Sequence, residues 1–312
     1  MRDKLAFFGK HPLTVRGMRL FYIVCMVYIL VFWRAFWTPD LLFIMFFFLF
    51  LLYGQGRQFF VNFGPFVAAL LAYDSLRGVV PFLSKHVHFT EMIDFDKWLF
   101  GGHLPTVVLQ QWWYSGHAVW YDFFFYLLYM CHFVAPMIAA VLIWKYRPQH
   151  YLRYGLAFLI LSYGGFLTYI AFPAAPPWMA SEMHLIPTIH KISSDVWWAL
   201  GVHNFPTIYQ YLSPNLTAAV PSLHSAYPLM IVLFVNRAFG WKWALALAWY
   251  PIAIWIGIVY MGEHYVFDAM VGVAYVFIAY WLTALIANRY GHHGRRLHTR
   301  IANKYGAKPL SG

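Results

Sequence analysis

The chain has 312 residues, of which 62% are hydrophobic, 22% aromatic and only 11% charged. Soluble domains usually carry about 25% charged residues, so this composition excludes a water-soluble globule and a disordered chain, and two cysteines are too few for a disulfide scaffold. The formal net charge of +11 is compatible with nucleic-acid binding, but the positions of the charges favour a multi-pass membrane protein.

Eight apolar runs are candidates for transmembrane helices, each of which needs about 20 mostly apolar residues. The second run is short, and the third contains Pro65. The first follows a basic N-terminus but lacks a small-residue cleavage site, so we expect it to be retained as an anchor. In chain order the runs are 20–37, 39–54, 59–77, 117–144, 153–172, 221–238, 243–262 and 267–287.

The basic residues orient these spans. With the N-terminus in the cytoplasm, the cytoplasmic segments hold 17 of the 22 lysines and arginines, but only Asp3 of the 11 acidic residues. Lys and Arg concentrate on the cytoplasmic side of membrane proteins, so we predict a cytoplasmic N-terminus at 1–19, a single transmembrane domain at 20–287 and a cytoplasmic tail at 288–312. Anionic lipid headgroups explain the basic tail, and we expect no nucleic-acid partner.

Two long segments face the outer side in this topology. Residues 78–116 include a stretch from Ile93 to Tyr114 that is typical of short interfacial helices, and residues 173–220 are rich in Pro, His and Trp. Trp and Tyr favour the headgroup level of a bilayer. We expect residues 84–116 and 178–215 to form a cover over the outer ends of the spans.

The sixth span begins with Pro221-Ser222-Leu223-His224. Proline suits the first turn of a helix, and a helix N-terminus offers free N–H groups and a positive dipole end that favour a bound phosphate. Ser222 adds a hydroxyl group and His224 a titratable donor. The pattern indicates an anion site, although a lone histidine at a membrane interface is more often a surface residue.

The motif Gly262-Glu263-His264-Tyr265-Val266-Phe267-Asp268 leads into the eighth span. If this stretch is helical, His264 and Asp268 share a face because they are four residues apart. A carboxylate that accepts one ring N–H fixes the tautomer and leaves the other ring nitrogen free to attack. A chance pairing is the alternative, since the chain has 15 histidines.

Two further clusters lie at outer ends of spans. The segment from Pro173 to Trp178 follows the fifth span, and its prolines cannot continue a helix. Arg77 ends the third span, and its planar guanidinium suits a phosphate, although it could instead pair with Asp74. All four clusters fall on one side of the membrane in a topology derived from charge alone, which indicates a shared functional site.

These motifs resemble the type-2 phosphatidic acid phosphatase superfamily. Pro221-Ser222-x-His224 followed by His264-x-x-x-Asp268 is similar to its paired motifs. The segment 173–178 and Glu263-His264-Tyr265 resemble the bacterial members of its inositol phosphorylceramide synthase-like branch, and the likeness extends from about Tyr73 to Gly272. The resemblance implies an all-α integral membrane protein with about eight transmembrane helices, a six-helix phosphatase-like core and short interfacial helices on the outer side.

The resemblance also implies metal-independent phosphoryl transfer on a lipid substrate, without a cofactor. His264 would attack phosphorus to form a phosphohistidine, Asp268 would orient it, and His224 would protonate the leaving oxygen, while Ser222 and nearby N–H groups hold the phosphate. Water or a second lipid alcohol would then release the phosphoryl group. Both a lipid phosphatase and a headgroup transferase, including an inositol-phosphate transferase, fit these motifs, with the site on the outer side of the plasma membrane.

The chain departs from the superfamily pattern in its phosphate-binding cations. The family has an Arg six residues before the second His, where this chain has Ile258, and a Lys and an Arg-Pro pair upstream. The pair Arg147-Pro148 falls on the cytoplasmic side and is interpreted as unrelated. Arg77 is the expected replacement ligand, with Lys85 and Lys191 as further candidates.

Several other residues are expected around the reacting groups. Asp122 lies beside an apolar run and needs a polar partner, and His132 lies in mid-span, where we expect it to be buried and hydrogen-bonded. The predicted supporting residues are Asp74, Asp122, Glu263, Tyr265 and Trp178.

Two other classes of protein are alternatives to this enzyme. Eight spans that contain Gly and Pro fit a lipid transporter or scramblase, but the inverted repeats of that class are absent from the sequence. The histidine count suggests a zinc enzyme, but Glu263-His264 lacks the leading histidine of the H-E-x-x-H motif, so no metal is expected.

Overall fold

The structure is a computed structural model that describes residues 17–26, 39–83, 86–201, 203 and 215–305. These residues are mainly helical, and two isolated β-bridges are the only extended pairing described. The elements are α3 (Pro39–Leu52), α4 (Gly56–Arg77), α5 (Val80–Leu83), α6 (Thr90–Leu99), α7 (Pro105–Trp113), α8 (Trp120–Tyr146), η1 (Pro148–His150), α9 (Tyr151–Ala171), α10 (Pro177–Glu182), α11 (Ile192–Ala199), α13 (Leu223–Phe239), α14 (Trp241–Leu247), α15 (Trp249–Tyr260) and α16 (Val266–Tyr305).

The apolar helices coincide in sequence with the eight predicted spans. Four segments are long and apolar enough to cross a membrane, and the bent pair within α8 is a fifth. Three shorter apolar helices correspond to the other predicted spans, although residues 27–37 of the first lie outside the described part of the chain. The four long segments are Gly56–Arg77, Pro148–Ala171, Trp241–Tyr260 and Val266–Arg289, and the shorter helices are Gly17–Met26, Phe43–Leu52 and Leu223–Phe239.

A proline explains the bend in α8. The two halves of this helix meet at 53° beside His132, and Pro136 lies four residues further on. A proline removes a backbone donor and its ring clashes with the carbonyl four residues earlier, here that of His132. The carbonyl of Pro136 accepts a hydrogen bond from the Tyr154 hydroxyl at 2.9 Å, which ties this part of α8 to α9. The bend therefore occurs at the turn of α8 that carries His132.

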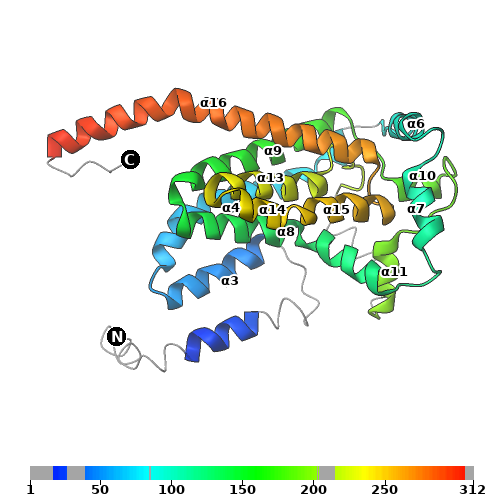
Figure 1. The fold of residues 1–312 in the computed structure, drawn as a ribbon, viewed down its shortest axis with the longest axis horizontal. Coiled ribbons are helices and arrows are strands. Elements are labelled where there is room, and N and C mark those ends of the chain that lie inside the picture. The colour runs from blue at the N-terminus through cyan, green and yellow to red at the C-terminus, as the bar shows by residue number, and fades with distance from the viewer. Residues whose placement is uncertain (1–16, 27–38, 84–85, 202, 204–214, 306–312) are drawn as a thin grey trace.

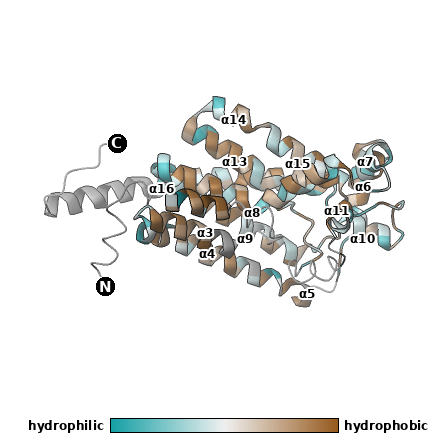
Figure 2. Ribbon diagram, turned by 90° about the horizontal axis from the view of Figure 1, so that it is seen from below, coloured by the Kyte–Doolittle hydropathy of each residue, from teal (hydrophilic) through white to brown (hydrophobic). Residues whose placement is uncertain are grey.

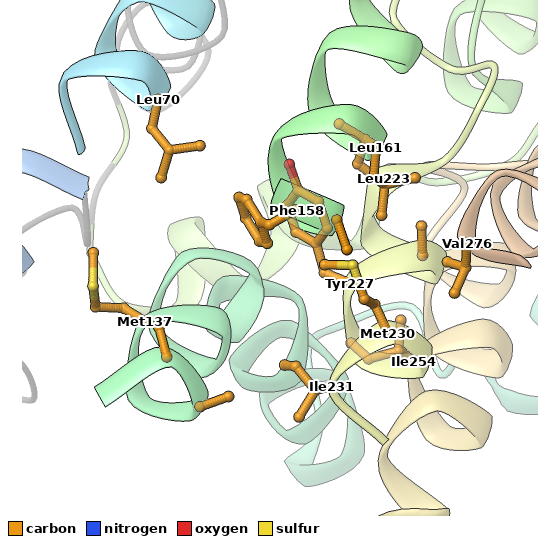
Figure 3. Close-up of a cluster of buried hydrophobic side chains, with 14 of the residues drawn as sticks. Leu70, Met137, Phe158, Leu161, Leu223, Tyr227, Met230, Ile231, Ile254 and Val276 are labelled. Carbon is orange, nitrogen blue, oxygen red and sulfur yellow. The ribbon is translucent and has the colours of Figure 1, made fainter. Parts of the chain in front are cut away.

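Helix α13 lies at the centre of the bundle. Its side chains are buried on most sides, as expected for a helix that is apolar all round. Tyr227 of α13 packs on Phe158 of α9, with ring centres 4.3 Å apart, and shares a hydrogen bond of 2.8 Å with Ser162. Figure 3 shows Tyr227 and Phe158 together with Ile254 of α15 and Val276 of α16. This core fixes the helix whose N-terminus carries His224.

The short helices gather at one end of the bundle. In Figure 1, α6, α7, α10 and α11 lie together at the end opposite to the one from which α16 extends. Figure 2 shows mostly hydrophobic residues along the bundle, with hydrophilic residues on these end helices and also at the opposite end and on α14. The described part of the predicted cover thus forms short helices, and α6 and α7 fall within the predicted interfacial stretch Ile93–Tyr114 or begin just before it.

Candidate active site

The proline-rich segment after α9 joins two distant parts of the chain. Ala174 and Ala175 are fully buried, and Ala174 forms β-bridges to both His88 and Ala218. The Ala174 N–H donates to the Thr217 carbonyl at 2.9 Å, and the Ala175 N–H donates to the His88 carbonyl at 2.9 Å. This extended segment has a neighbouring segment on each side, which leaves little space. The small side chains of Ala174 and Ala175 fit that space. This segment holds the chain that leads into α13.

Ser222 connects the two motifs that carry the histidines. Its side-chain oxygen caps α13 by accepting the Ser225 N–H at 3.2 Å, and its own N–H donates to the Asp268 carbonyl at 3.0 Å. Ser222 is fully buried. A hydroxyl that accepts a cap hydrogen bond can still donate its own hydrogen, so the phosphate-binding role predicted for Ser222 is chemically compatible with this cap.

Gly272 allows the two helices to approach closely. A Cβ atom on Gly272 would lie 2.3 Å from the Ser225 hydroxyl oxygen and 2.4 Å from the Ser222 carbonyl oxygen, distances that no side chain tolerates. The start of α13 therefore packs directly on the backbone of α16, which keeps Ser222 within reach of Asp268.

His264 and Asp268 are paired, but not as two residues on one helix. His264 lies before α16, in a turn where the Ile258 carbonyl accepts the N–H groups of both Glu263 and His264 at 3.1 Å. Asp268 Oδ2 lies 3.2 Å from His264 Nδ1 and accepts the Tyr265 N–H at 2.9 Å. The contact thus resembles a capping box, in which the third helical residue reaches back to the start of the helix. Because the ring contacts Asp268 through Nδ1, its Nε2 atom remains available for reaction.

The two histidines face each other across a short distance. The ring centres of His224 and His264 are 5.8 Å apart, with the planes inclined at 47°. His264 is 6% exposed, whereas His224 is partly exposed. Because reacting atoms meet at about 3–3.5 Å, this separation allows one phosphoryl group to contact both rings.

Helix α8 fixes the ring of His224 from the opposite side. The Tyr129 ring stacks on His224 with ring centres 3.9 Å apart and planes 7° apart. His132 lies 4.0 Å from His224 and 4.5 Å from Tyr227. The column of four rings limits the orientations that His224 can adopt. His132 is buried, as predicted.

Arg77 lies within electrostatic range of His224 and of His132. Its guanidinium carbon is 5.8 Å from the centre of the Tyr73 ring. The predicted alternative partner of Arg77, the Asp74 carboxylate, lies outside the described side chains, and so does Lys85. Of the predicted cations, Arg77 is therefore one that the structure describes and that lies near His224.

Lys191 approaches the site from α11 and its preceding loop. Its ammonium nitrogen lies 4.0 Å from the centre of the Trp178 ring, and the Trp178 N–H donates to the Gly262 carbonyl at 3.1 Å. Burial lowers the pKa of Lys191, and the negative charge of Glu263 opposes this shift. Glu263 accepts a hydrogen bond of 2.5 Å from the Ser193 hydroxyl. These contacts support the turn that carries His264.

The remaining predicted residues have structural partners. Asp122 accepts hydrogen bonds from the Val119 N–H at 2.8 Å and from the Tyr260 hydroxyl at 2.7 Å, so it caps α8 and ties it to α15. Tyr265 is 1% exposed and packs in a small apolar core. Neither side chain has a described contact with the two histidines.

Two residues relevant to the superfamily pattern lie where the sequence suggested. Ile258 is fully buried and contributes its carbonyl to the turn before His264. Arg147 donates to the Ala238 carbonyl at 2.9 Å, at the end of α13 opposite to His224. A helix of 17 residues is about 25 Å long, so the Arg147-Pro148 pair is remote from the histidines.

Sequence reasoning missed two residues that hold the site from a distance. The Asp96 carboxylate of α6 accepts the Val266 and Phe267 N–H groups at 3.0 and 2.9 Å. The Gln110 side chain of α7 donates to the carbonyls of His190 and Tyr260 at 2.7 and 2.9 Å. Neither residue belongs to a local motif, although buried polar residues on short amphipathic helices are a signal for such contacts. In the described part of the chain, no group of three His, Cys, Asp or Glu side chains could hold a metal ion.

Comparison with known proteins places this geometry in a family. A sequence model described as the PAP2 superfamily matches residues 90–282. Phosphoinositol dihydroceramide synthase of Bacteroides thetaiotaomicron is 30% identical over 224 residues, which cover 67% of this chain and 71% of that protein. Inositol phosphorylceramide synthase of Candida albicans is 31% identical over 151 residues, which cover 45% of this chain and 31% of that protein. No solved structure shows significant similarity.

A second fungal protein is similar over a shorter region. Inositolphosphotransferase 1 of Saccharomyces cerevisiae is 30% identical over 122 residues, 36% of this chain and 23% of that protein. The fungal relatives are thus matched over only a minor part of their own length, whereas the bacterial relative is matched over most of it. The match to the family model covers both histidine motifs, and the chain belongs to the PAP2 superfamily.

Proposed function

We propose that this protein transfers an inositol phosphate, or a closely similar polyol phosphate, from a phospholipid to the hydroxyl group of a ceramide-like lipid. The protein is a multi-pass membrane phosphotransferase that acts on phospholipid headgroups. The names of the bacterial and fungal relatives support inositol phosphate as the group and a ceramide as the acceptor. The transporter alternative has no similar support, because the relatives are named as synthases and transferases.

The facing histidines are the observation that carries the chemistry of this proposal. One ring, His264, has a carboxylate on Nδ1, so its Nε2 can act as a nucleophile. The centre of the other ring, His224, lies 5.8 Å from that of His264, and His224 can donate a proton to a leaving oxygen. This arrangement fits a reaction that proceeds by two displacements at phosphorus.

In the first displacement, Nε2 of His264 bonds to phosphorus and the bond from phosphorus to the glycerol oxygen of the donor breaks. His224 gives its proton to that oxygen, and a diacylglycerol leaves. Asp268 stabilises the positive charge that develops on the His264 ring, because its carboxylate already accepts the Nδ1 hydrogen.

In the second displacement, the acceptor hydroxyl gives its proton to His224, and its oxygen bonds to phosphorus while the bond to Nε2 breaks. The phosphorylated acceptor leaves and both histidines return to their starting states. Positive charges and N–H donors placed around the phosphoryl oxygens supply most of the stabilisation in such reactions. We assign these roles to Arg77 and to the N-terminus of α13 with Ser222, while Trp178 and Glu263 support the turn.

The proposed location follows from the charge distribution. Both termini lie in the cytoplasm, and the site faces the outer side of the plasma membrane. The end helices α6, α7, α10 and α11 then lie at the outer surface, where they limit the access of water to the phosphohistidine. Exclusion of water favours transfer to a lipid hydroxyl over hydrolysis.

The test uses purified protein in liposomes that contain phosphatidylinositol and a fluorescent dihydroceramide. We expect a fluorescent phosphoinositol product to form in the presence of EDTA. His264→Ala should abolish product formation, whereas His103→Ala, a change at an exposed histidine of the connection between α6 and α7, should retain it. Full turnover by His264→Ala would overturn the mechanism, and dihydroceramide flux across the bilayer without product would favour a transporter.

A further inference from the structure

Asp96 of α6 controls the start of the helix that carries Asp268. Its side chain is fully buried, and its two carboxylate oxygens accept the N–H groups of Val266 and Phe267 at 3.0 and 2.9 Å. The first N–H groups of a helix have no partner within the helix. Here the partner comes from a residue 170 positions earlier in the chain.

Two carboxylates therefore hold every N–H group between the proposed nucleophile and its orienting residue. Asp268 accepts the Tyr265 N–H at 2.9 Å, and Asp96 accepts the next two. The backbone from His264 to Asp268 is thereby fixed at three consecutive peptide groups. The position of the His264 ring relative to the Asp268 carboxylate depends on this backbone, because His264 lies outside the regular helix.

A small apolar core joins α6 to the same turn. Met92 and Ile93 of α6 are buried together with Tyr265 and with Ala219 and Val220, the residues that precede the His224 motif. The Phe95 ring also packs on the Phe267 ring, which follows in the same turn, with ring centres 4.9 Å apart. Helix α6 thus contacts the turn that carries His264 and shares an apolar core with the residues that precede the His224 motif.

We propose that Asp96 is a positioning residue that attaches the turn carrying His264, the proposed nucleophile, to the outer helix α6. The inference rests on the proposed role of His264. The described hydrogen bonds of Asp96 go to the backbone of Val266 and Phe267 and not to His264, so Asp96 acts through the backbone. Misplacement of a reacting group by about 1 Å can lower the rate about 100-fold. Loss of the Asp96 hydrogen bonds should therefore affect turnover more than substrate binding.

The variants Asp96→Ala and Asp96→Asn test this role, with Asp94→Asn as the matched control on the exposed side of α6. We expect Asp96→Ala to lower kcat by about 30- to 100-fold with KM changed by less than about threefold. Asp96→Asn should lose less, because its amide oxygen still accepts one N–H group. Asp94→Asn should match the wild type.

Hydrogen exchange provides a readout that does not depend on the assigned activity. In Asp96→Ala and Asp96→Asn, peptides that span residues 264–270 should exchange faster, while peptides from the middle of α16 should not. Unchanged exchange in this turn, or unchanged kcat in both Asp96 variants, would overturn the proposal. If the wild type forms no product but hydrogen exchange at residues 264–270 is faster in the Asp96 variants, the positioning role of Asp96 is supported and the proposed function fails.

Discussion

Neighbouring rings restrict the orientation of His224, the residue for which we propose proton transfer. Its ring stacks on Tyr129 and packs at a tilt against His132, with ring centres 3.9 and 4.0 Å away, and Arg77 lies within electrostatic range. The stack restricts rotation of the ring, so the proton is offered in one direction. A cation close to His224 is also well placed to hold a phosphoryl oxygen.

The phosphate-binding role of Arg77 can be measured directly. Arg77→Gln should lower kcat/KM by about 10- to 100-fold, because a hydrogen bond to a charged group contributes about 1.5–3 kcal/mol. Arg77→Lys should recover part of the loss, since it keeps the charge but not the planar fork. Arg57→Gln, at the opposite end of α4, is the control. Equal rates for Arg57→Gln and Arg77→Gln would exclude this role.

Local sequence motifs predicted only some of the residues that lie together at the site. His224, His264 and Asp268 stood out because each lies beside Pro, Ser or Gly at a short spacing, and the structure brings the three together. His264 precedes α16 and so does not share a helix with Asp268, yet the two side chains meet at 3.2 Å because Asp268 reaches back to the turn. Asp96 was missed, since a cap supplied from a distant helix belongs to no local motif, and a polar residue on a short amphipathic helix does not reveal its partner.

The packing of α13 against α16 sets the geometry at the level of the elements. Gly272 lets the Ser222 and Ser225 oxygens approach the backbone of α16. The Ser225 hydroxyl donates to the carbonyls of Ser222 and Ala269 at 2.8 and 3.1 Å. The two helix starts therefore behave as one unit held by backbone contacts.

Gly272→Ala should separate these helices. The added Cβ atom meets two oxygen atoms well inside contact distance, so we expect a loss of about 1–3 kcal/mol in stability and a larger loss of activity. Thermal unfolding in detergent and the transfer assay measure both. Gly164→Ala is the control, because its Cβ atom would lie 3.6 Å from the Tyr275 ring, an ordinary contact. Equal melting temperatures for the two variants would refute the close-packing argument.

The cap of α16 also predicts a dependence of stability on pH. Burial raises the pKa of Asp96 from 3.8 to about 6, Asp268 on the facing helix adds to this rise, and the hydrogen bonds from Val266 and Phe267 oppose it. The folded protein thus binds this proton more tightly than the unfolded chain. The resulting stabilisation is complete below pH 3.8 and is lost as the pH rises to about 6.

We therefore expect the melting temperature of the wild type, relative to that of Asp96→Asn, to fall between pH 4 and pH 6 and to be level above that range. Scans at constant ionic strength measure the difference. Asp94→Asn should show no such trend relative to the wild type. A difference that rises with pH would contradict the raised pKa of Asp96.

At the scale of the whole molecule, the described residues form a bundle of mainly apolar helices with short helices at one end (Figures 1 and 2). The positions of the spans could be predicted because long apolar runs are a strong local signal. The bend beside His132 and the division of the seventh span into α14 and α15 were not predicted. They depend on how Pro136 and neighbouring turns are accommodated by other helices, which a hydropathy pattern does not contain.

The predicted orientation can be tested with single cysteines in a background that lacks Cys25 and Cys131. Glu182→Cys on α10 and Lys242→Cys on α14 replace exposed residues that are predicted on opposite sides of the membrane. A membrane-impermeant maleimide should label the cysteine at position 182 in intact cells and the one at 242 only after permeabilisation. The reverse pattern would invert the topology and place the site in the cytoplasm.

The most direct test is to locate the covalent intermediate. Wild-type protein is incubated with phosphatidylinositol without an acceptor lipid and quenched in base, in which a phosphorus–nitrogen bond survives, and its peptides are analysed by mass spectrometry. We predict a phosphoinositol group on the imidazole of His264, absent from His264→Ala and lost when dihydroceramide is added. The same group on another residue, or transfer that continues in His264→Ala, would contradict the account.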